Sequence, residues 1–141
     1  MFTSVSSRSA ASYQLVGEES VVHGSSPQQL IGMLFAGLLK SIALAKLAIA
    51  RGDNKEKIRE LGKAIRILQE GLMGNLDLQR GGTVAVNLAR IYEYCGMRLV
   101  QANLRTDSDA LDEVTKLLGT VSAGWSEMEV AGRAQSVKYS N

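Results

Sequence analysis

Residues 82–107, GTVAVNLARIYEYCGMRLVQANLRTD, decide the fold class of this chain. Placed on a helix, the apolar residues recur at spacings of three and four along one face: Val84, Leu88, Ile91, Cys95, Leu99 and Ala102. A second apolar group falls on the opposite side and consists of Val86, Met97, Val100 and Leu104. A helix that is apolar on two sides is either central in its domain or faces a partner. Because no catalytic set of residues accompanies these faces, the segment favours a helical binding protein over an enzyme.

Helical patterns flank this segment on both sides, and we expect four helices in all. They are predicted over residues 26–50, 53–73, 83–105 and 108–128. Ser26 is a good N-cap residue, and Pro27 suits the first helical position, where its missing N–H costs nothing. Gly81 and Gly82 are expected to break the chain before the third helix. Four helices of about 20 residues joined by short loops predict an all-α fold, an antiparallel up-down four-helix bundle.

The second predicted helix carries both apolar and charged residues. Its apolar stripe consists of Ile58, Leu61, Ile65, Leu68 and Leu72. Ile67 faces the other way, and the basic residues, Lys57 among them, alternate with acids as on a solvated helix face. We therefore expect Ile58 inside the bundle, with Ile67 and Lys57 outside its core.

The two ends of the chain differ from the bundle in composition. Residues 1–24 are rich in serine and lack periodicity, so they are expected to form a mobile or docked N-terminal arm. Residues 25–128 are expected to form the four-helix bundle. From Glu129 the chain becomes polar and aperiodic, and residues 129–141 are expected to be a loose C-terminal tail.

Composition argues against several classes of function. Sixteen basic and 14 acidic residues give a net charge of +2 without a basic stripe, so no nucleic-acid partner is expected. Lys40 and Lys46 interrupt the most apolar window, residues 30–50, which argues against membrane insertion. Cys95 is the only cysteine, so no internal disulfide can form, as is usual in the reducing cytoplasm.

Catalytic and metal sites lack the residues that they need. His23 is the only histidine, whereas a di-iron bundle needs a Glu-x-x-His pair from each of two helices. One histidine and one cysteine in separate segments provide too few ligands for zinc. The spacing of Cys95 places it on the core face, away from any Cys–His nucleophile pair. We therefore expect no enzyme activity, no metal and no cofactor.

Residues in both halves of the chain resemble a known family. The N-terminal half has Ser12 and Tyr13, then SPQQLI at residues 26–31 and MLF at residues 33–35. The second half has Gly82, Ala85, Asn87, Leu88, Ile91, Tyr92, Tyr94, Arg98, Leu99, Ala102 and Asn103, followed by Leu111, Val114, Leu117 and Trp125. In order and spacing, these residues resemble the flagellin-specific export chaperones of bacterial flagella, over about residues 13–128.

The resemblance implies a cytoplasmic chaperone with a four-helix bundle and a short N-terminal segment packed against it. Its partner would be the disordered C-terminal segment of flagellin, which it keeps from polymerising prematurely and delivers to the cytoplasmic domain of the export gate. The candidate flagellin-binding residues are Tyr13, Leu30, Met33, Leu44, Asn87, Tyr92, Arg98 and Asn103. Periodicity leaves open which apolar faces form the core and which form the groove.

Two alternatives stay open at this point. Polar residues beside the core stripe, such as Tyr92 and Arg98, either lie at the edges of a bundle seam or rim a groove that orients a peptide. The chain is expected to be a monomer or weak dimer. The alternative function is a structural bundle that self-associates through its extra apolar faces, or an adaptor with a different partner.

Overall fold

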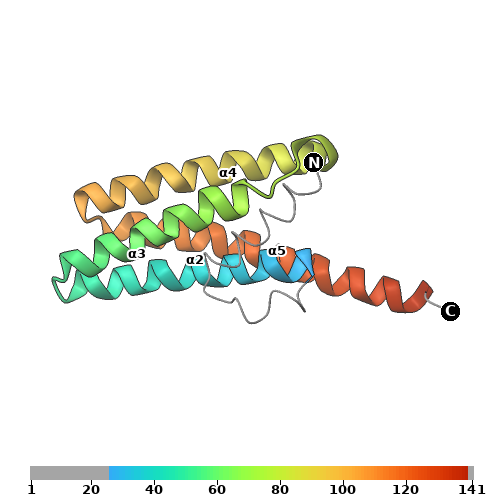
Figure 1. The fold of residues 1–141 in the computed structure, drawn as a ribbon, viewed down its shortest axis with the longest axis horizontal. Coiled ribbons are helices and arrows are strands. Elements are labelled where there is room, and N and C mark those ends of the chain that lie inside the picture. Colours follow the sequence, from blue (N-terminus) through green and yellow to red (C-terminus); the bar gives the residue numbers. More distant parts are fainter. Residues whose placement is uncertain (1–25, 140–141) are drawn as a thin grey trace.

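The computed structural model describes residues 26–139, with side chains as far as Met128. The elements follow in the order α2 (Pro27–Ala50), α3 (Asn54–Arg66), η2 (Ile67–Met73), α4 (Leu78–Arg105) and α5 (Ser108–Tyr139) (Figure 1). The π-helix η2 continues α3 without a break, so the two form one rod. Within residues 26–139 there are four helical rods and no strand, which confirms the expected all-α bundle. Tyr13 and the expected N-terminal arm lie outside the described residues.

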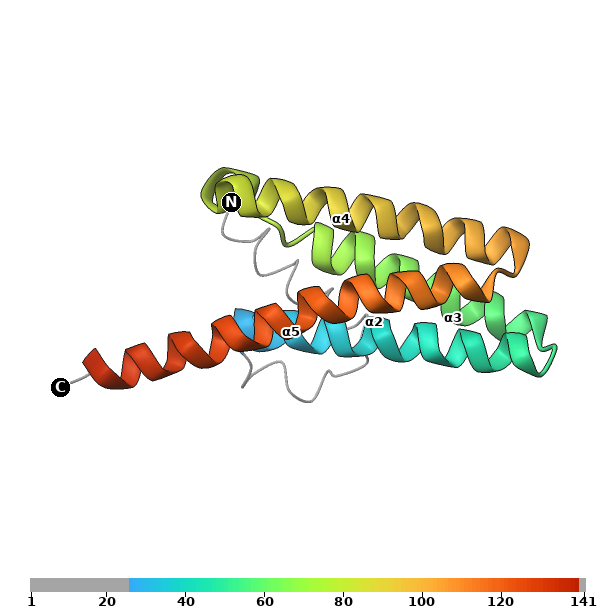
Figure 2. The same cartoon turned by 180° about the vertical axis from the view of Figure 1, so that it is seen from behind.

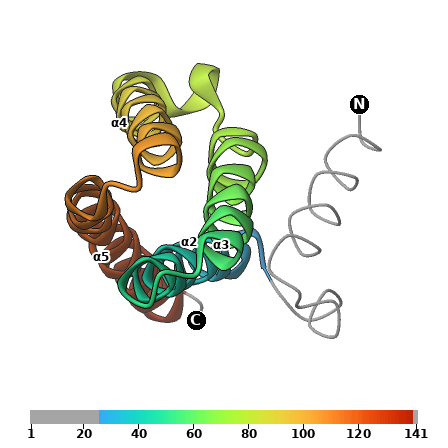
Figure 3. The ribbon, with the colours of Figure 1, turned by 90° about the vertical axis from the view of Figure 1, so that its left-hand side faces the viewer.

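Each rod packs on two neighbours. α2 contacts α3, η2 and α5, while α4 contacts α5 and the rod formed by α3 and η2. The view along the bundle shows α2 and α4 across from each other (Figure 3). Rods that are adjacent in the chain are therefore adjacent in space, which is the up-down arrangement that short connections favour.

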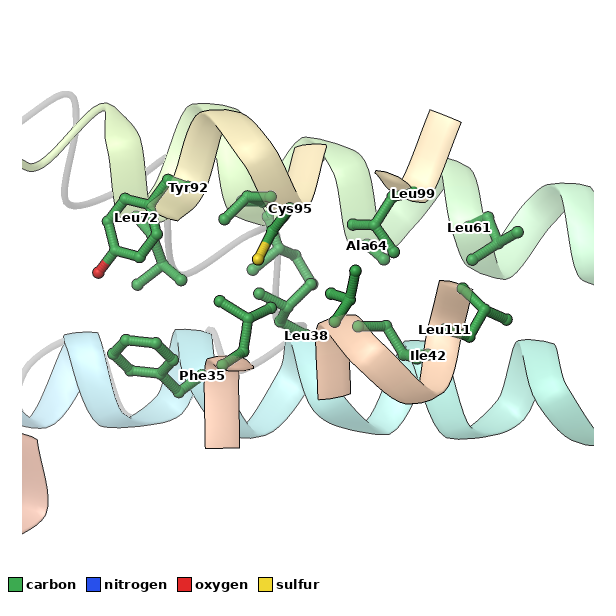
Figure 4. Packing of buried hydrophobic residues seen from close by; sticks show 14 of the residues in the cluster. Phe35, Leu38, Ile42, Leu61, Ala64, Leu72, Tyr92, Cys95, Leu99 and Leu111 are labelled. Carbon is green, nitrogen blue, oxygen red and sulfur yellow. The ribbon is translucent and has the colours of Figure 1, made fainter. Parts of the chain in front are cut away.

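The core is filled mainly by aliphatic side chains. Leu34, Leu38 and Ile42 of α2 are fully buried. The close-up shows α2 side chains pointing toward those of α3, η2 and α4 (Figure 4). α2 is also long and apolar enough, by length and composition alone, to cross a membrane. Because its apolar face packs in the bundle core, this helix does not indicate membrane insertion.

The start of α2 is built as its sequence predicts. The hydroxyl of Ser26 accepts a hydrogen bond from the backbone N–H of Gln29 at 3.1 Å. In return, the side-chain oxygen of Gln29 accepts one from the backbone N–H of Ser26 at 2.8 Å. Pro27 occupies the first turn, where no N–H is needed. This capping box fixes the point at which the bundle begins.

The break before the third predicted helix lies at Gly82. Its φ of 55° and ψ of −135° fall in a region open essentially to glycine, and they kink α4. The chain before the kink is one helical turn instead of the expected loop. Asp77 begins this turn, because its carboxylate accepts hydrogen bonds from the backbone N–H groups of Gln79 and Arg80, both at 3.1 Å.

The predicted orientation of the second helix is wrong in three places. Ile58 is 49% exposed, whereas Ile67 is fully buried and Lys57 is only 4% exposed. The core face follows Lys57, Leu61, Ala64 and Leu68 instead of the stripe that starts at Ile58. The change to π-helix also alters the register, since a π-helix closes its hydrogen bonds five residues apart. The N–H of Gly74, for example, donates to the carbonyl of Gln69 at 3.1 Å.

Two ends of helices differ from the expectation. Val84, expected in the core, is 64% exposed just after the kink at Gly82. The backbone of α5 is helical to Tyr139, so the expected end of the helix near Met128 is wrong. No proline follows Pro27, so no residue of α5 lacks the backbone N–H that a helix uses. Both side views show α5 beside α2 and running beyond its N-terminal end (Figures 1 and 2).

Candidate functional site

Four apolar side chains on α4 face away from the core, and we call them the outer stripe. They are Val86, Met97, Val100 and Leu104, with exposed fractions of 41%, 49%, 41% and 81%. The sequence left open whether this second apolar group is core or surface, and the structure places it on the surface. Met97, Val100 and Leu104 form its continuous part, about 10 Å long at 1.5 Å per residue, and the exposed Glu93 separates them from Val86. A surface helix with such a face has apolar area available for a partner.

A groove between η2 and α4 adjoins the outer stripe. It encloses about 200 Å³ and is lined by Leu68, Gln69, Met73, Tyr92, Glu93, Gly96 and Met97. Because Met97 belongs to both features, the groove opens onto the stripe. Gly96 leaves space in the groove that a Cβ would fill, in ordinary van der Waals contact with Leu68 at 3.7 Å and Gln69 at 3.8 Å.

Tyr92 connects the groove to the core. Its side chain is 5% exposed, and burial raises the pKa of its hydroxyl to about 12. The phenol is therefore protonated at neutral pH and can donate a hydrogen bond. The close-up places Tyr92 among the core residues, beside Leu72 (Figure 4). An apolar groove with a few polar groups at its edge is typical of a site that binds and orients a peptide.

A polar cluster lies at the far end of α4. The ammonium group of Lys57 donates hydrogen bonds to the carbonyl oxygen of Asn103 at 2.9 Å and to Thr106 Oγ1 at 3.0 Å. Lys57 thereby satisfies one of the carbonyl groups left without a partner at the end of a helix. Beside this cluster is a second cavity of about 160 Å³, lined by Ala48, Ile49, Gly52, Asp53, Asn54, Lys57 and Thr106.

A third polar group joins α4 to α5 on a different side of α4. The Tyr94 hydroxyl donates to Glu113 Oε1 at 2.5 Å, and Arg98 Nε donates to the same oxygen at 3.0 Å. These two hydrogen bonds, that of Tyr94 first, hold the pKa of Glu113 below its ordinary value. All three side chains are exposed or half-buried, so this is a surface link between helices.

Comparison with known proteins places this architecture in a family. The family model described as "Flagellar protein FliS" matches residues 9–132. The chain belongs to the FliS family. Its relatives carry the name flagellar secretion chaperone, so the family resemblance read from the sequence is confirmed and the chain is a flagellar export chaperone.

Three relatives in the FliS family show how closely the chain is matched. The Salmonella typhimurium FliS chaperone is 42% identical over 116 residues, which cover 82% of this chain and 86% of the relative. The Pseudomonas aeruginosa FliSB chaperone is 45% identical over 113 residues, covering 80% and 89%. The Escherichia coli FliS chaperone is 38% identical over 115 residues, covering 82% and 85%.

The candidate binding residues predicted from the sequence do not form one cluster in this FliS-family fold. On α2, Leu30 is 3% exposed and belongs to the core, Met33 packs against the core, and Leu44 is 36% exposed. α2 lies across the bundle from α4 (Figure 3), so these residues are separate from the α4 set. Tyr13 lies outside the described residues.

The four candidate residues on α4 lie in different surroundings. Tyr92 lines the groove, and the backbone of Asn103 belongs to the Lys57 cluster. Arg98 is bound to Glu113 of α5, and Asn87 is exposed. Their roles in flagellin binding stay predictions.

Sequence reasoning missed the η2 wall of the groove. Gln69 and Met73 line it, but their pattern gave no sign of a π-helix. Met97 belongs to the second apolar face but is not among the binding residues that the sequence predicts. The signal that could have found the groove was this face itself, because an apolar residue that the core does not need is a candidate for contact with a partner.

Proposed function

We propose that this FliS-family chain is a cytoplasmic chaperone for flagellin. It binds the disordered C-terminal segment of flagellin, prevents premature polymerisation and delivers the subunit to the cytoplasmic domain of the export gate. The observation that carries the proposal is the exposed outer stripe of α4 beside the groove. These apolar side chains face away from the bundle core and are available to an apolar partner.

The shape of the surface fits a guest that becomes an amphipathic helix. Helix-in-groove recognition places apolar anchors at i, i+3, i+4 and i+7 of the guest into a groove. On α4, Met97, Val100 and Leu104 repeat at three and four residues and offer a matching row of contacts. The groove at Met97 has room for an apolar anchor, and Gln69 and Glu93 stand at its edge as polar partners.

The energetics suit a reversible holding role. Burial of apolar area contributes about 25 cal/mol per Å². A disordered guest that folds on binding typically buries about 1,000–3,000 Å² and loses a few kcal/mol to ordering. Affinity therefore depends on contact area and requires no chemical step.

The proposal is tested by titrating the protein with the last ~50 residues of its cognate flagellin in a calorimeter, a length chosen because coupled folding needs a large contact. Saturable binding is expected at micromolar concentrations. Met97→Glu places a charge on the outer stripe and should weaken binding at least about tenfold, since a buried unpaired charge costs several kcal/mol. Met128→Glu is the matched control, because Met128 is 66% exposed on α5, away from the stripe.

The results separate the proposal from its alternatives. Absence of heat and of chemical-shift changes with the native protein would refute flagellin binding. A tight dimer in light scattering that ignores flagellin would favour the self-associating bundle instead, with the outer stripe as the contact between copies. If Met97→Glu and Met128→Glu lose affinity equally, the outer stripe is not part of the binding surface.

The N-terminal arm has a proposed part in the same function. Tyr13 and its apolar neighbours in sequence are proposed to cover the binding surface when it is empty and to leave when flagellin arrives. The support is an arm with apolar residues that leads directly into Ser26, the cap of α2. Deleting residues 1–20 should change flagellin affinity, and identical isotherms would count against arm gating.

A further inference from the structure

Lys57 is a buried cation whose partners are all neutral. Its side chain is 4% exposed, and its ammonium donates to a backbone carbonyl and a hydroxyl. Across residues 26–128, no carboxylate lies within ion-pair distance of it. An ammonium group has three N–H donors, of which two are used here. A buried charge without a counter-charge is costly, so the position favours an anion brought by a ligand.

The cavity beside Lys57 provides a place for that anion. Lys57 and Thr106 both line its volume of about 160 Å³. Thr106 Oγ1 accepts the hydrogen bond from Lys57, which leaves its own O–H proton free to donate. The cavity thus presents an ammonium and a hydroxyl as neighbouring donors, the combination that a carboxylate can accept through its two oxygens.

The acidic residue in the cavity wall is already engaged. Asp53 Oδ1 accepts a hydrogen bond from the backbone N–H of Glu56 at 3.1 Å, as the N-cap of α3. Asp53 Oδ2 lies 3.5 Å from the guanidinium of Arg51. Arg51 and the positive end of the α3 dipole therefore offset the charge of Asp53 near the cavity.

A neighbouring acceptor is also unsatisfied. Asn103 Oδ1 is buried and has no hydrogen bond within the described part of the chain. Buried polar atoms without partners are rare and call for an explanation. Asn103 does not line the cavity, so its side chain is not part of the proposed site.

The position of the cavity relative to the outer stripe identifies the end of the guest. The stripe runs along α4 and ends at Leu104, two residues before Thr106. A guest segment lying on the stripe would reach the cavity with one of its ends. Of the two ends of a polypeptide, only the C-terminal one carries a carboxylate.

We propose that the cavity between Lys57 and Thr106 binds the terminal carboxylate of the guest chain. The inference rests on the proposed function, because the guest is the C-terminal segment of flagellin. Lys57 Nζ and Thr106 Oγ1 donate to the carboxylate oxygens, and the apolar residues before it lie along the outer stripe. The site therefore recognises where the guest chain stops as well as its apolar face.

The test uses two flagellin peptides of identical sequence, the last ~50 residues, one with a free terminal carboxylate and one with a terminal amide. With the native chaperone, the amide should bind about tenfold more weakly, because a hydrogen bond to a charged group contributes more than one to a neutral group. Against Lys57→Met, the two peptides should bind equally. Thr106→Val, which leaves Lys57 in place, should reduce the difference between them.

Melting temperatures check that the variants fold, because Lys57 also caps α4. The comparison of the two peptides uses the native chaperone, so its result does not depend on whether the variants fold. Equal affinity of acid and amide for the native protein overturns the inference and leaves flagellin binding intact. The inference is also overturned if affinity falls only when an internal Asp or Glu of the peptide is replaced by Asn or Gln. If neither peptide binds, the proposed function fails and this inference with it.

Discussion

The indole N–H of Trp125 donates a hydrogen bond to the backbone carbonyl of Gln28 at 3.3 Å, across 97 residues of sequence. It joins α5 to the first turn of α2, next to the capping box of Ser26. This end of the bundle is where α2 begins. This hydrogen bond therefore holds the first turn of α2 against α5.

Trp125→Phe should loosen this end of the bundle. The variant keeps an aromatic ring and removes the donor, so we expect a loss of about 1 kcal/mol in the free energy of unfolding. Urea unfolding measures the loss. Hydrogen exchange should quicken in the first turn of α2 and stay unchanged in the middle of α3. Faster exchange throughout the molecule would contradict a local role.

Gly71 and Gly62 provide a matched pair for the close packing of η2 on α2. A Cβ on Gly71 would lie 2.8 Å from a methyl carbon of Leu34, which is itself fully buried. Gly71→Ala should therefore destabilise the protein by about 1–3 kcal/mol. Gly62 has open space around its missing Cβ. Gly62→Ala should instead stabilise α3 by about 0.5–1 kcal/mol, and equal melting temperatures for the two variants would refute the argument.

The stabilising effect of Tyr94 should depend on pH. The pKa of Glu113 is lowered in the folded protein, first by the hydrogen bond from Tyr94. A carboxylate of this kind stabilises the fold above its unfolded pKa, and the effect is lost as pH falls through the lower folded value. Tyr94→Phe should lower the urea midpoint at pH 7, and its difference from the native protein should shrink below about pH 4. A difference that stays constant would contradict the role of Glu113.

Cys95 should be unreactive in the folded state. Burial raises the pKa of its thiol to about 11. At pH 8 this reduces the thiolate fraction about 100-fold relative to a free cysteine, before any steric shielding. A colorimetric thiol reagent should label the native protein slowly and the urea-unfolded protein at once. Rapid labelling of the native protein would mean that α4 opens readily at Cys95.

Local signals in the sequence predicted much of the fold. Ser26 with Pro27 marked the start of α2, and Gly82 marked the break before the long part of α4. Each of these depends on backbone chemistry within a few residues, which is why it can be read without the structure. Periodicity also predicted that α4 has two apolar faces, but it could not predict which of them lies outside the core.

Tertiary packing decided what the sequence could not predict. The rod of α3 and η2 is rotated from its expected face, so Ile67 lies inside and Ile58 outside. Charge pattern placed Lys57 on a solvated face, but its partners lie 46 and 49 residues away in sequence. The groove wall at Met73 depends on the π-helix, which no local sequence pattern predicted. Sites built from two distant segments are therefore the part that needed coordinates.

The kink at Gly82 has a consequence for how this protein tolerates mutation. The space around its missing Cβ is open, so no neighbouring atom opposes a larger residue. The obstacle is the backbone alone, whose φ of 55° and ψ of −135° every L-residue resists. In a saturation library selected for motility, this exposed position should be as depleted of variants as a position in the core.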